Sequence, residues 1–470
     1  MKVKNKKFLT SPSDLNNFVS CKYLIQNDIK YLHKEIRRNE ESIDQKLWKE
    51  FGLKHEKKHF DLLKKYYKKN ISIKQDLTEE ERNKKTIEAI KKGYDLIYHA
   101  YLIDGDFRGE ADFLIKVDTA SDLGDFSYEV YDTKITRKPK PRHIYQITAY
   151  SHMLSTIQGI LPERMYLIDG ADITHQYKIK EFIDFYHYTK KNFDKFLKNI
   201  VKEKVYPEKC SHCNFCDYTD ECEKIWTEDN YINQVAKINR SQIEKLKKIG
   251  INTVKKLAST NPEKIKVKIN KQALIDRISQ AQLQEEKRET GKSKYIILDP
   301  DKGKGFYKLP KPDDGDLFFD IEGYPQEDGR GFEYLHGIYF KGPKGMEFKY
   351  FWAKDFKKKY EQENFIELIN FFKSHFKKYP KAHLYHYNSY EKRSLRQLAS
   401  LFSSDFPEGS NFVDSLLRGE KFVDLFLIVN QSVRTTEKDM SLKSIEEVLY
   451  GFKRTADVKK AEDSVKLYDF

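Results

Sequence analysis

The sequence lacks any apolar run near the roughly 18 residues that a membrane-spanning helix needs. Its densest apolar stretch covers only residues 425–429, and no internal repeat or long low-complexity tract is present. Residues 1–18 also lack the apolar core of about 7 to 15 residues that marks a signal peptide. The chain has only five cysteines in 470 residues. We therefore expect a cytoplasmic protein with no membrane partner and no disulfide framework.

Positive charge, by contrast, is in excess. The chain has 87 Lys and Arg against 73 Asp and Glu, a net charge of +14, and 14% of its residues are aromatic. This balance favours a polyanionic partner, with nucleic acid as the first candidate. Lysine-rich, solvated helix faces explain the same composition equally well, so charge alone assigns no function.

The length suggests about three domains, and changes of pattern divide the chain accordingly. In the first segment, residues 1–226, helical spacing near the start gives way to two β-rich runs, 107–118 and 127–136, separated by turn formers. These runs predict a hairpin. A helix over 143–157, a strand over 164–168 and a basic amphipathic helix over 181–204 should follow. The first segment is therefore predicted to be α/β.

A lysine-rich helical segment is predicted over residues 230–285. Ile249, Gly250 and Ile251 suit a tight turn, with a new helix starting near Thr253. This pattern resembles a helix-hairpin-helix, whose free backbone N–H groups bind phosphate. A plain helical linker is the alternative. Residues 286–315 are predicted to be a linker, after which strands indicate a further domain over 316–470.

The most informative run in the first segment contains Asp132 and Lys134. Strand periodicity puts these two side chains on one face. If the neighbouring strand supplies Asp112, two carboxylates can hold a hard divalent ion against a scissile phosphate, while the lysine orients or helps to deprotonate the attacking water. The Asp-x-Lys triplet recurs elsewhere in the chain, so a surface ion pair is the alternative.

The order of four features favours the chemical interpretation. Gly52 to His55 is followed by Gly109 to Asp112, then by Asp132 with Lys134, and finally by Gln146 with Tyr150. This order resembles the RecB-type branch of the PD-(D/E)xK nucleases, which have a restriction-endonuclease-like fold. In that branch a helical Gly-x-x-His precedes a Gly-x-x-Asp strand, a (D/E)xK strand and a Gln-x-x-x-Tyr helix.

The resemblance implies roles for these residues. Asp112 and Asp132 would be the carboxylate ligands of Mg2+ or Mn2+, and Lys134 the catalytic lysine. His55 would be an additional metal ligand, although a structural histidine or a zinc pair with His59 at i+4 are alternatives for His55. The side chains one helical turn apart, Gln146 and Tyr150, would line the site and contact DNA.

Four of the five cysteines are crowded at the end of this segment. Cys213-x-x-Cys216, five residues and then Cys222 close it, while Cys21 lies far upstream. This split resembles the iron-sulfur subset of RecB-type nucleases, where one N-terminal and three C-terminal cysteines bind a [4Fe-4S] cluster. Cys210 departs from that pattern, since Cys210, Cys213, Cys216 and Cys222 form a local set that suits Zn2+ instead.

The last domain carries Asp320 and Glu322 two residues apart on a predicted strand. Such a pair suits a two-metal site and resembles the first motif of DEDD-type exonucleases, which have an RNase H-like fold. Glu391 stands in the second motif, where an aspartate is usual. The final motif is expected beyond the last residue, and Asp424 is assigned no ligand role. We expect this domain to be C-terminally incomplete and catalytically silent.

The order of all segments resembles a family of RecB-like nucleases often continued by a helicase. No nucleotide-binding loop is present, because Gly291-Lys292-Ser293 has Glu286 where a glycine is required. We expect a metal-dependent DNA nuclease, an exonuclease on single strands or duplex ends, in repair, recombination or defence. Its partners would be DNA and a helicase in cis or trans. The alternatives are a non-catalytic nucleic-acid-binding scaffold for a helicase, and a ribonuclease that uses the C-terminal domain.

Overall fold

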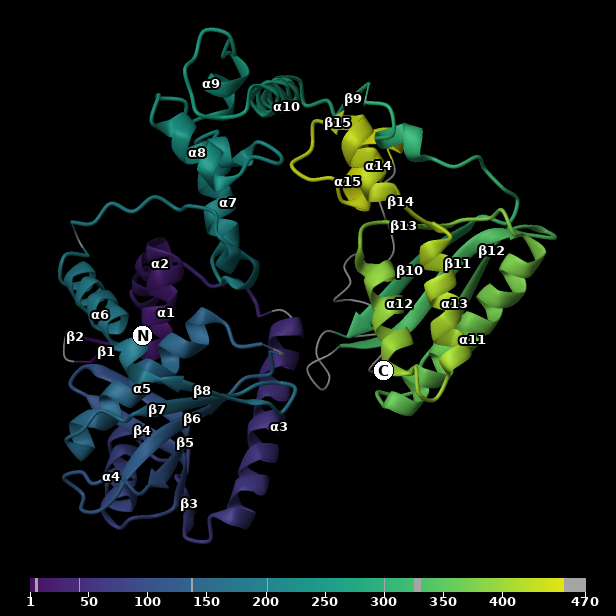
Figure 1. The fold of residues 1–470 in the computed structure, drawn as a ribbon. Helices are drawn as coiled ribbons and strands as arrows, with labels where there is room; N and C mark the ends of the chain where they lie inside the picture. The colour runs from purple at the N-terminus through teal and green to yellow at the C-terminus, as the bar shows by residue number, and fades with distance from the viewer. Residues whose placement is uncertain are drawn as a thin grey trace. The chain divides into compact units, whose positions relative to one another are not determined.

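The chain forms two compact units in a computed structural model (Figure 1). One unit comprises residues 1–222, and the other comprises the described residues from 223 onward. The structure describes residues 1–4, 7–41, 43–136, 138–200, 202–299, 301–324 and 331–451. None of the described helices combines the length and the hydropathy needed to cross a membrane.

A six-stranded sheet, with its strands in chain order, is the centre of the N-terminal unit. The strands β4, β5 and β6 pair antiparallel, β3 is parallel to β4, β7 is parallel to β6, and β8 is antiparallel to β7. The strands are β3 (Asn70–Ser72), β4 (Leu96–Asp104), β5 (Phe107–Val117), β6 (Ser127–Thr133), β7 (Arg164–Ile168) and β8 (Thr174–Lys178). The predicted hairpin is confirmed as β5 and β6, whereas the sequence did not predict β4.

Helices cover both faces of this sheet. Leu15, Ile147 and Phe193 come from three helices that share the main core cluster with the strands, while Phe60 of α3 packs with Tyr98 and others on the opposite face. The helices are α1 (Pro12–Ser20), α2 (Lys22–Leu32), α3 (Ile43–Tyr66), α4 (Glu79–Lys91), α5 (Pro141–Gln158) and α6 (Ile183–Lys198), and a short pair, β1 (Lys2–Lys4) with β2 (Lys7–Leu9), precedes them.

Local signals explain where the helix nearest the candidate site begins and ends. Pro141 occupies the first turn of α5, where a missing N–H is tolerated, and Gly159 ends the helix at φ 73°, a conformation that favours glycine. By contrast α6 ends at Lys198 rather than at residue 204 as predicted, because backbone bonds to Asn199 close its last turn. Helix α5, which carries two predicted site residues, is confirmed.

The second unit starts with short helices. The predicted turn is present: Gly250 has φ 81°, and Thr253 caps the next helix by accepting a hydrogen bond from Lys256 N. The predicted linker is partly ordered into elements, because residues 286–290 extend α10 and β9 pairs with β15. These elements are α7 (Thr219–Glu228), α8 (Arg240–Lys247), α9 (Val254–Ala258), α10 (Lys271–Thr290), β9 (Tyr295–Ile297) and β15 (Val433–Thr435).

A five-stranded mixed sheet follows, in the order β12-β11-β10-β13-β14. The first three strands are antiparallel, and β10, β13 and β14 run parallel. The elements are β10 (Leu317–Tyr324), β11 (Phe332–Gly342), β12 (Gly345–Trp352), α11 (Lys358–Lys378), β13 (Leu384–His386), α12 (Tyr390–Leu401), α13 (Pro407–Arg418), β14 (Phe422–Asp424), α14 (Leu425–Ser432) and α15 (Leu442–Tyr450). Residues 452–470 of this predicted domain lie outside the described residues.

Candidate functional site

Two aspartates meet on neighbouring strands of the N-terminal sheet. Asp112 lies on β5 beside the pair Phe113 and Tyr131, and Asp132 follows Tyr131 on β6. The backbone N–H and the hydroxyl of Thr133 both donate to Asp112 Oδ2 at 2.7 Å. Asp132 is 1% exposed and shares a hydrogen bond with Asp112. The structure therefore brings together the two carboxylates that the sequence pairs.

Lys134 belongs to the same group. Its backbone N–H donates to Ile168 O at 2.8 Å, which anchors the chain just after β6, and its Nζ forms an ion pair with Asp132. Burial lowers the pKa of Lys134, but the charges of Asp132 and Asp112 outweigh burial, so that this pKa lies above its ordinary value. Lys134 is therefore a cation in this site at neutral pH.

Burial governs the protonation of Asp132. Removal from water, and next the charge of Asp112, raise the pKa of Asp132 to about 7, although Lys134 acts in the opposite direction. The positive charge of Lys134 alone therefore does not compensate the negative charges of the buried aspartates. A further cation placed between the carboxylates would offset their repulsion.

Glu56, on α3, is a third carboxylate in this group. Burial and then the charge of Asp112 raise the pKa of Glu56 to about 8, with a further contribution from Asp132. Sequence reasoning missed Glu56 because the Gly-x-x-His pattern directed attention to the preceding residue. The usable signal was an acidic residue directly after His55 on the same predicted helix.

A backbone irregularity in β4 places His99 beside these acids. Tyr98 pairs with Phe113 and Ala100 pairs with Ala111, so the register is kept, but His99 and Asp112 do not pair between them. His99 has φ 58°, a strained value for a histidine in a strand. Its Nδ1 lies 2.6 Å from Glu110 Oε1 and 3.5 Å from Glu56 Oε1. Burial lowers the pKa of His99 to about 4, so the ring is neutral.

The predicted pair on α5 lies together as expected. Gln146 Nε2 donates to the Tyr150 hydroxyl at 3.2 Å, and burial followed by the charge of Asp132 raises the pKa of Tyr150. Gly109 explains how this ring approaches β5. A Cβ on Gly109 would lie 2.7 Å from Tyr150 Cε1, so only glycine leaves room for the tyrosine beside the strand that carries Asp112.

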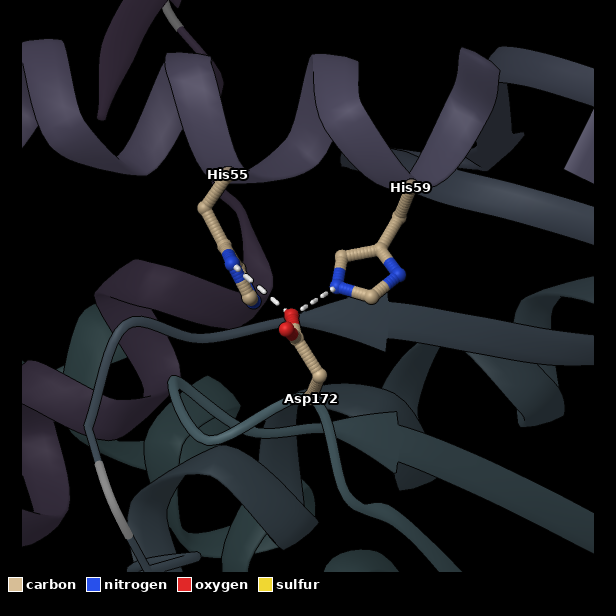
Figure 2. Close-up of side chains that lie close together, drawn as sticks. All are labelled: His55, His59 and Asp172. Carbon is tan, nitrogen blue, oxygen red and sulfur yellow. Dashed lines mark hydrogen bonds and ion pairs between the residues drawn. The ribbon is translucent and has the colours of Figure 1, made fainter. Parts of the chain in front are cut away.

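The acidic residue beside His55 is Asp172, not Asp112 or Asp132. Its Nδ1 is 3.9 Å from Asp172 Oδ1, and His59 Nε2 is 2.9 Å from the same oxygen (Figure 2). Burial, and then the charge of His59, lower the pKa of His55. The sequence did not single out Asp172, which lies in the turn between β7 and β8.

A basic hollow of about 650 Å³ opens beside Lys134. Five of its lining residues are Lys or Arg and two are Asp or Glu. Trp48 and Phe215 also line it, with ring centroids 5.1 Å apart, and Phe215 is 41% exposed. Cationic side chains beside an aromatic pair, in which Phe215 is exposed and Trp48 is half-buried, suit a nucleic-acid strand, whose phosphates are anionic and whose bases stack.

Three of the cysteine sulfurs converge. Cys210 shares hydrogen bonds with the thiols of Cys21 and Cys213, and these bonds hold the pKa of Cys210 below its ordinary range. Its Sγ lies 3.9 Å from that of Cys213. Cys216 lies within electrostatic reach of Cys210, while Cys222 and Cys21 both lie within electrostatic reach of Tyr23. Cys210, which the family-like set omits, therefore lies within the sulfur group.

The two acidic residues predicted on one strand of the C-terminal sheet, Asp320 and Glu322, share one face of β10, as the alternation of side chains along a strand requires. Phe319 and Ile321 are buried, whereas Asp320 is exposed and Glu322 is half-buried, so the acids lie on the other face of β10. Glu391 lies in the first turn of α12 and is buried, and its Oε2 is 3.4 Å from His386 Nδ1.

Asp424 has a structural role in this domain. Its Oδ1 accepts hydrogen bonds from Asn388 N at 3.1 Å and from Leu427 N at 3.2 Å, the second of which caps α14. A carboxylate used in this way ends one strand and starts the next helix.

Comparison with models of known protein families gives a match in the C-terminal domain. A model of the RNase H superfamily matches residues 317–470. No curated protein matches the chain. The match and the mixed sheet described above agree on a nuclease-like fold in the C-terminal domain, which indicates nucleic-acid hydrolysis as the class of activity.

The cluster of three acidic side chains, Asp112, Asp132 and Glu56, predicts a pH dependence of stability. The pKa of Glu56 is about 8 in the folded chain against an ordinary 4.5. A carboxyl whose folded pKa is raised stabilises the fold below the unfolded pKa, and this contribution is lost as pH rises through the folded pKa. In chelator-treated protein we expect the Tm, followed by circular dichroism, to fall from pH 4.5 through about 8, and to fall less in Glu56→Gln.

Glu88→Gln on the exposed face of α4 is the matched control and should keep the wild-type slope. An equally steep slope in Glu56→Gln would contradict the placement of Glu56 among the acids.

Proposed function

We propose that this protein is a metal-dependent nuclease that hydrolyses DNA with its N-terminal unit. The observation that carries the proposal is the buried pair Asp112 and Asp132 with Lys134, because Lys134 also lines the basic, aromatic hollow. A strand held in that hollow would bring its phosphate next to the carboxylates. The C-terminal match to a nucleic-acid hydrolase fold supports the same class of activity.

The residues present suit a hard divalent cation. Carboxylate oxygens from Asp112 and Asp132, with Glu56 nearby, are ligands of the kind that Mg2+ and Mn2+ prefer. When bound, such an ion supplies Lewis-acid activation of the phosphate and of a water. Lys134 stays protonated, so it offsets the charge that develops on the phosphate instead of acting as a base. Thr133 fixes Asp112 through two hydrogen bonds.

The hollow favours single strands or unpaired duplex ends as substrate. The rings of Trp48 and Phe215 are available to stack only with bases that are not paired in a helix. Exonuclease action on DNA ends, in repair, recombination or defence, and a helicase partner in cis or trans follow from the family resemblance. The turn at Gly250 would add a second DNA contact.

Cleavage assays on end-labelled single-stranded and duplex DNA with Mg2+ or Mn2+ test this proposal. Asp132→Asn should abolish cleavage, because it removes a ligand. Lys134→Gln should lower the rate about 100-fold or more, since it removes one charge-stabilising group, yet leave metal affinity within a few-fold. Lys84→Gln, an exposed change on α4, is the control.

The same substrates, with RNA added, separate the alternatives. If Asp320→Asn removes cleavage while Asp132→Asn does not, the activity belongs to the C-terminal domain, and preferential RNA cleavage identifies a ribonuclease. DNA binding without cleavage under all metal conditions identifies a scaffold. Either result contradicts the proposal.

The hollow predicts which changes weaken DNA binding. Trp48→Ala should lower affinity for single-stranded DNA by about 10-fold, because one stacked base contributes about 1–3 kcal/mol. Arg142→Ala should lower affinity and also reduce the dependence on salt by about one phosphate contact. Fluorescence anisotropy without divalent metal measures both, with Lys84→Ala as the control. Unchanged binding in both variants excludes the hollow as the DNA site.

The cysteines supply a second proposal, a [4Fe-4S] cluster on Cys21, Cys213, Cys216 and Cys222, which rests on the family resemblance. The separation of 3.9 Å between the Cys210 and Cys213 sulfurs favours the alternative, because tetrahedral Zn2+ holds its sulfur ligands about 3.8 Å apart.

Anaerobically purified protein distinguishes the two metals. The cluster predicts brown protein that contains iron and keeps its colour in Cys210→Ser. Colourless protein with one zinc, lost in Cys210→Ser, would establish the alternative. Metal analysis and visible absorption measure both, with Cys213→Ser as the variant that loses metal in either case.

A further inference from the structure

Two histidines and an aspartate form a separate group on the N-terminal unit. His55 and His59 are four residues apart on α3, so both rings project from one face of the helix towards Asp172 (Figure 2). One ligand atom from each residue lies within 4.8 Å of the other two. Asp172 belongs to the turn between β7 and β8, so the group joins two distant parts of the chain.

The spacing of these atoms suits a metal ion. Tetrahedral Zn2+, with bonds of about 2.1 Å, separates its ligand atoms by about 3.4 Å. The two measured distances to Asp172 Oδ1, 2.9 Å from His59 and 3.9 Å from His55, lie on either side of that value.

The turn holds Asp172 in place for this role. Asp172 has φ 62°, which aspartate tolerates better than most residues but which still needs support. Asp169, 1% exposed, supplies it, since its Oδ1 accepts hydrogen bonds from Ala171 N at 2.9 Å and Ile173 N at 3.0 Å. The Asp172 side chain is 48% exposed, so water can reach the fourth position of a metal bound here.

We propose that His55, His59 and Asp172 bind a transition metal ion, Zn2+ in preference to Mg2+, with water as the fourth ligand. Two imidazoles and one carboxylate are ligands that Zn2+ prefers, whereas Mg2+ requires oxygen. The site is distinct from the Asp112 and Asp132 pair, and the inference does not depend on nuclease activity.

The spacing His-Glu-x-x-His also occurs in zinc peptidases, where the glutamate is the general base. Here Glu56 points elsewhere, towards His99 and Asp112, and belongs to the cluster of acidic side chains around Asp112 and Asp132. The geometry therefore assigns metal binding to this site without peptide hydrolysis.

Lys58 provides a test that distinguishes a metal site from a cluster of side chains with only a structural role. Its Nζ lies 2.6 Å from Asp172 Oδ2, so its ammonium competes with a metal for that carboxylate. Removing this charge should strengthen metal binding. Removing a ligand should weaken it.

The experiment uses the full chain after chelator treatment and dialysis. Zinc binding is followed by calorimetry, and Co2+ is used as a visible-absorption probe. In His59→Ala and in Asp172→Asn, the amount of zinc bound should fall by one ion per chain, or its affinity should fall about 100-fold. Lys58→Gln should bind several-fold more tightly than wild type. Asn also tolerates a positive φ, so Asp172→Asn keeps the turn even if His59→Ala does not fold.

Two controls separate this site from the others. His33→Ala, an exposed histidine just after α2, and His187→Ala, an exposed histidine on α6, should both bind zinc as wild type does. Cobalt held by imidazole and carboxylate lacks the near-ultraviolet charge-transfer absorption of cobalt thiolates. The proposal is overturned if Asp172→Asn binds zinc as wild type does, if either control variant loses the zinc site, or if all bound cobalt shows thiolate absorption.

Discussion

The burial of a carboxylate beside another carboxylate is the constraint on which the N-terminal unit depends. Asp132 is 1% exposed, hydrogen-bonded to Asp112 and paired with one lysine. Uncompensated charge of this kind costs several kcal/mol unless it is paired or neutralised. The double hydrogen bond from Thr133 and the anchored backbone of Lys134 hold the group in place against that repulsion. The arrangement is far better suited to a cation than to an apolar core.

Sequence reasoning recovered the parts of this site that local periodicity specifies. The strands β5 and β6, helix α5 and the contacts of Asp132 with Lys134 and of Gln146 with Tyr150 all follow from residue spacing. The spacing of two on a strand and of four on a helix fixes a side chain's face without any tertiary information. For that reason, these elements predicted from the sequence agree with those in the structure.

The remaining parts depend on contacts between segments far apart in the chain. Strand β4 escaped notice because it is buried and interrupted at His99, where the residues on either side contact different core clusters. Glu56 joins the acids only because α3 packs across the sheet. Asp172 reaches the histidines from a turn more than 110 residues away along the chain. No local sequence pattern specifies which distant residues such side chains contact.

Helix α3 carries Glu56 directly after His55, so that one rigid element contributes to both groups of side chains. Any movement of this helix relative to the sheet displaces the carboxylate and the imidazole together. If a ligand at one group changes affinity at the other by shifting α3, thermodynamic linkage requires that a ligand at the second group changes affinity at the first by the same factor. Consecutive residues on a single helical turn thus give these two groups of side chains one shared support, so that only a ligand which moves α3 couples them.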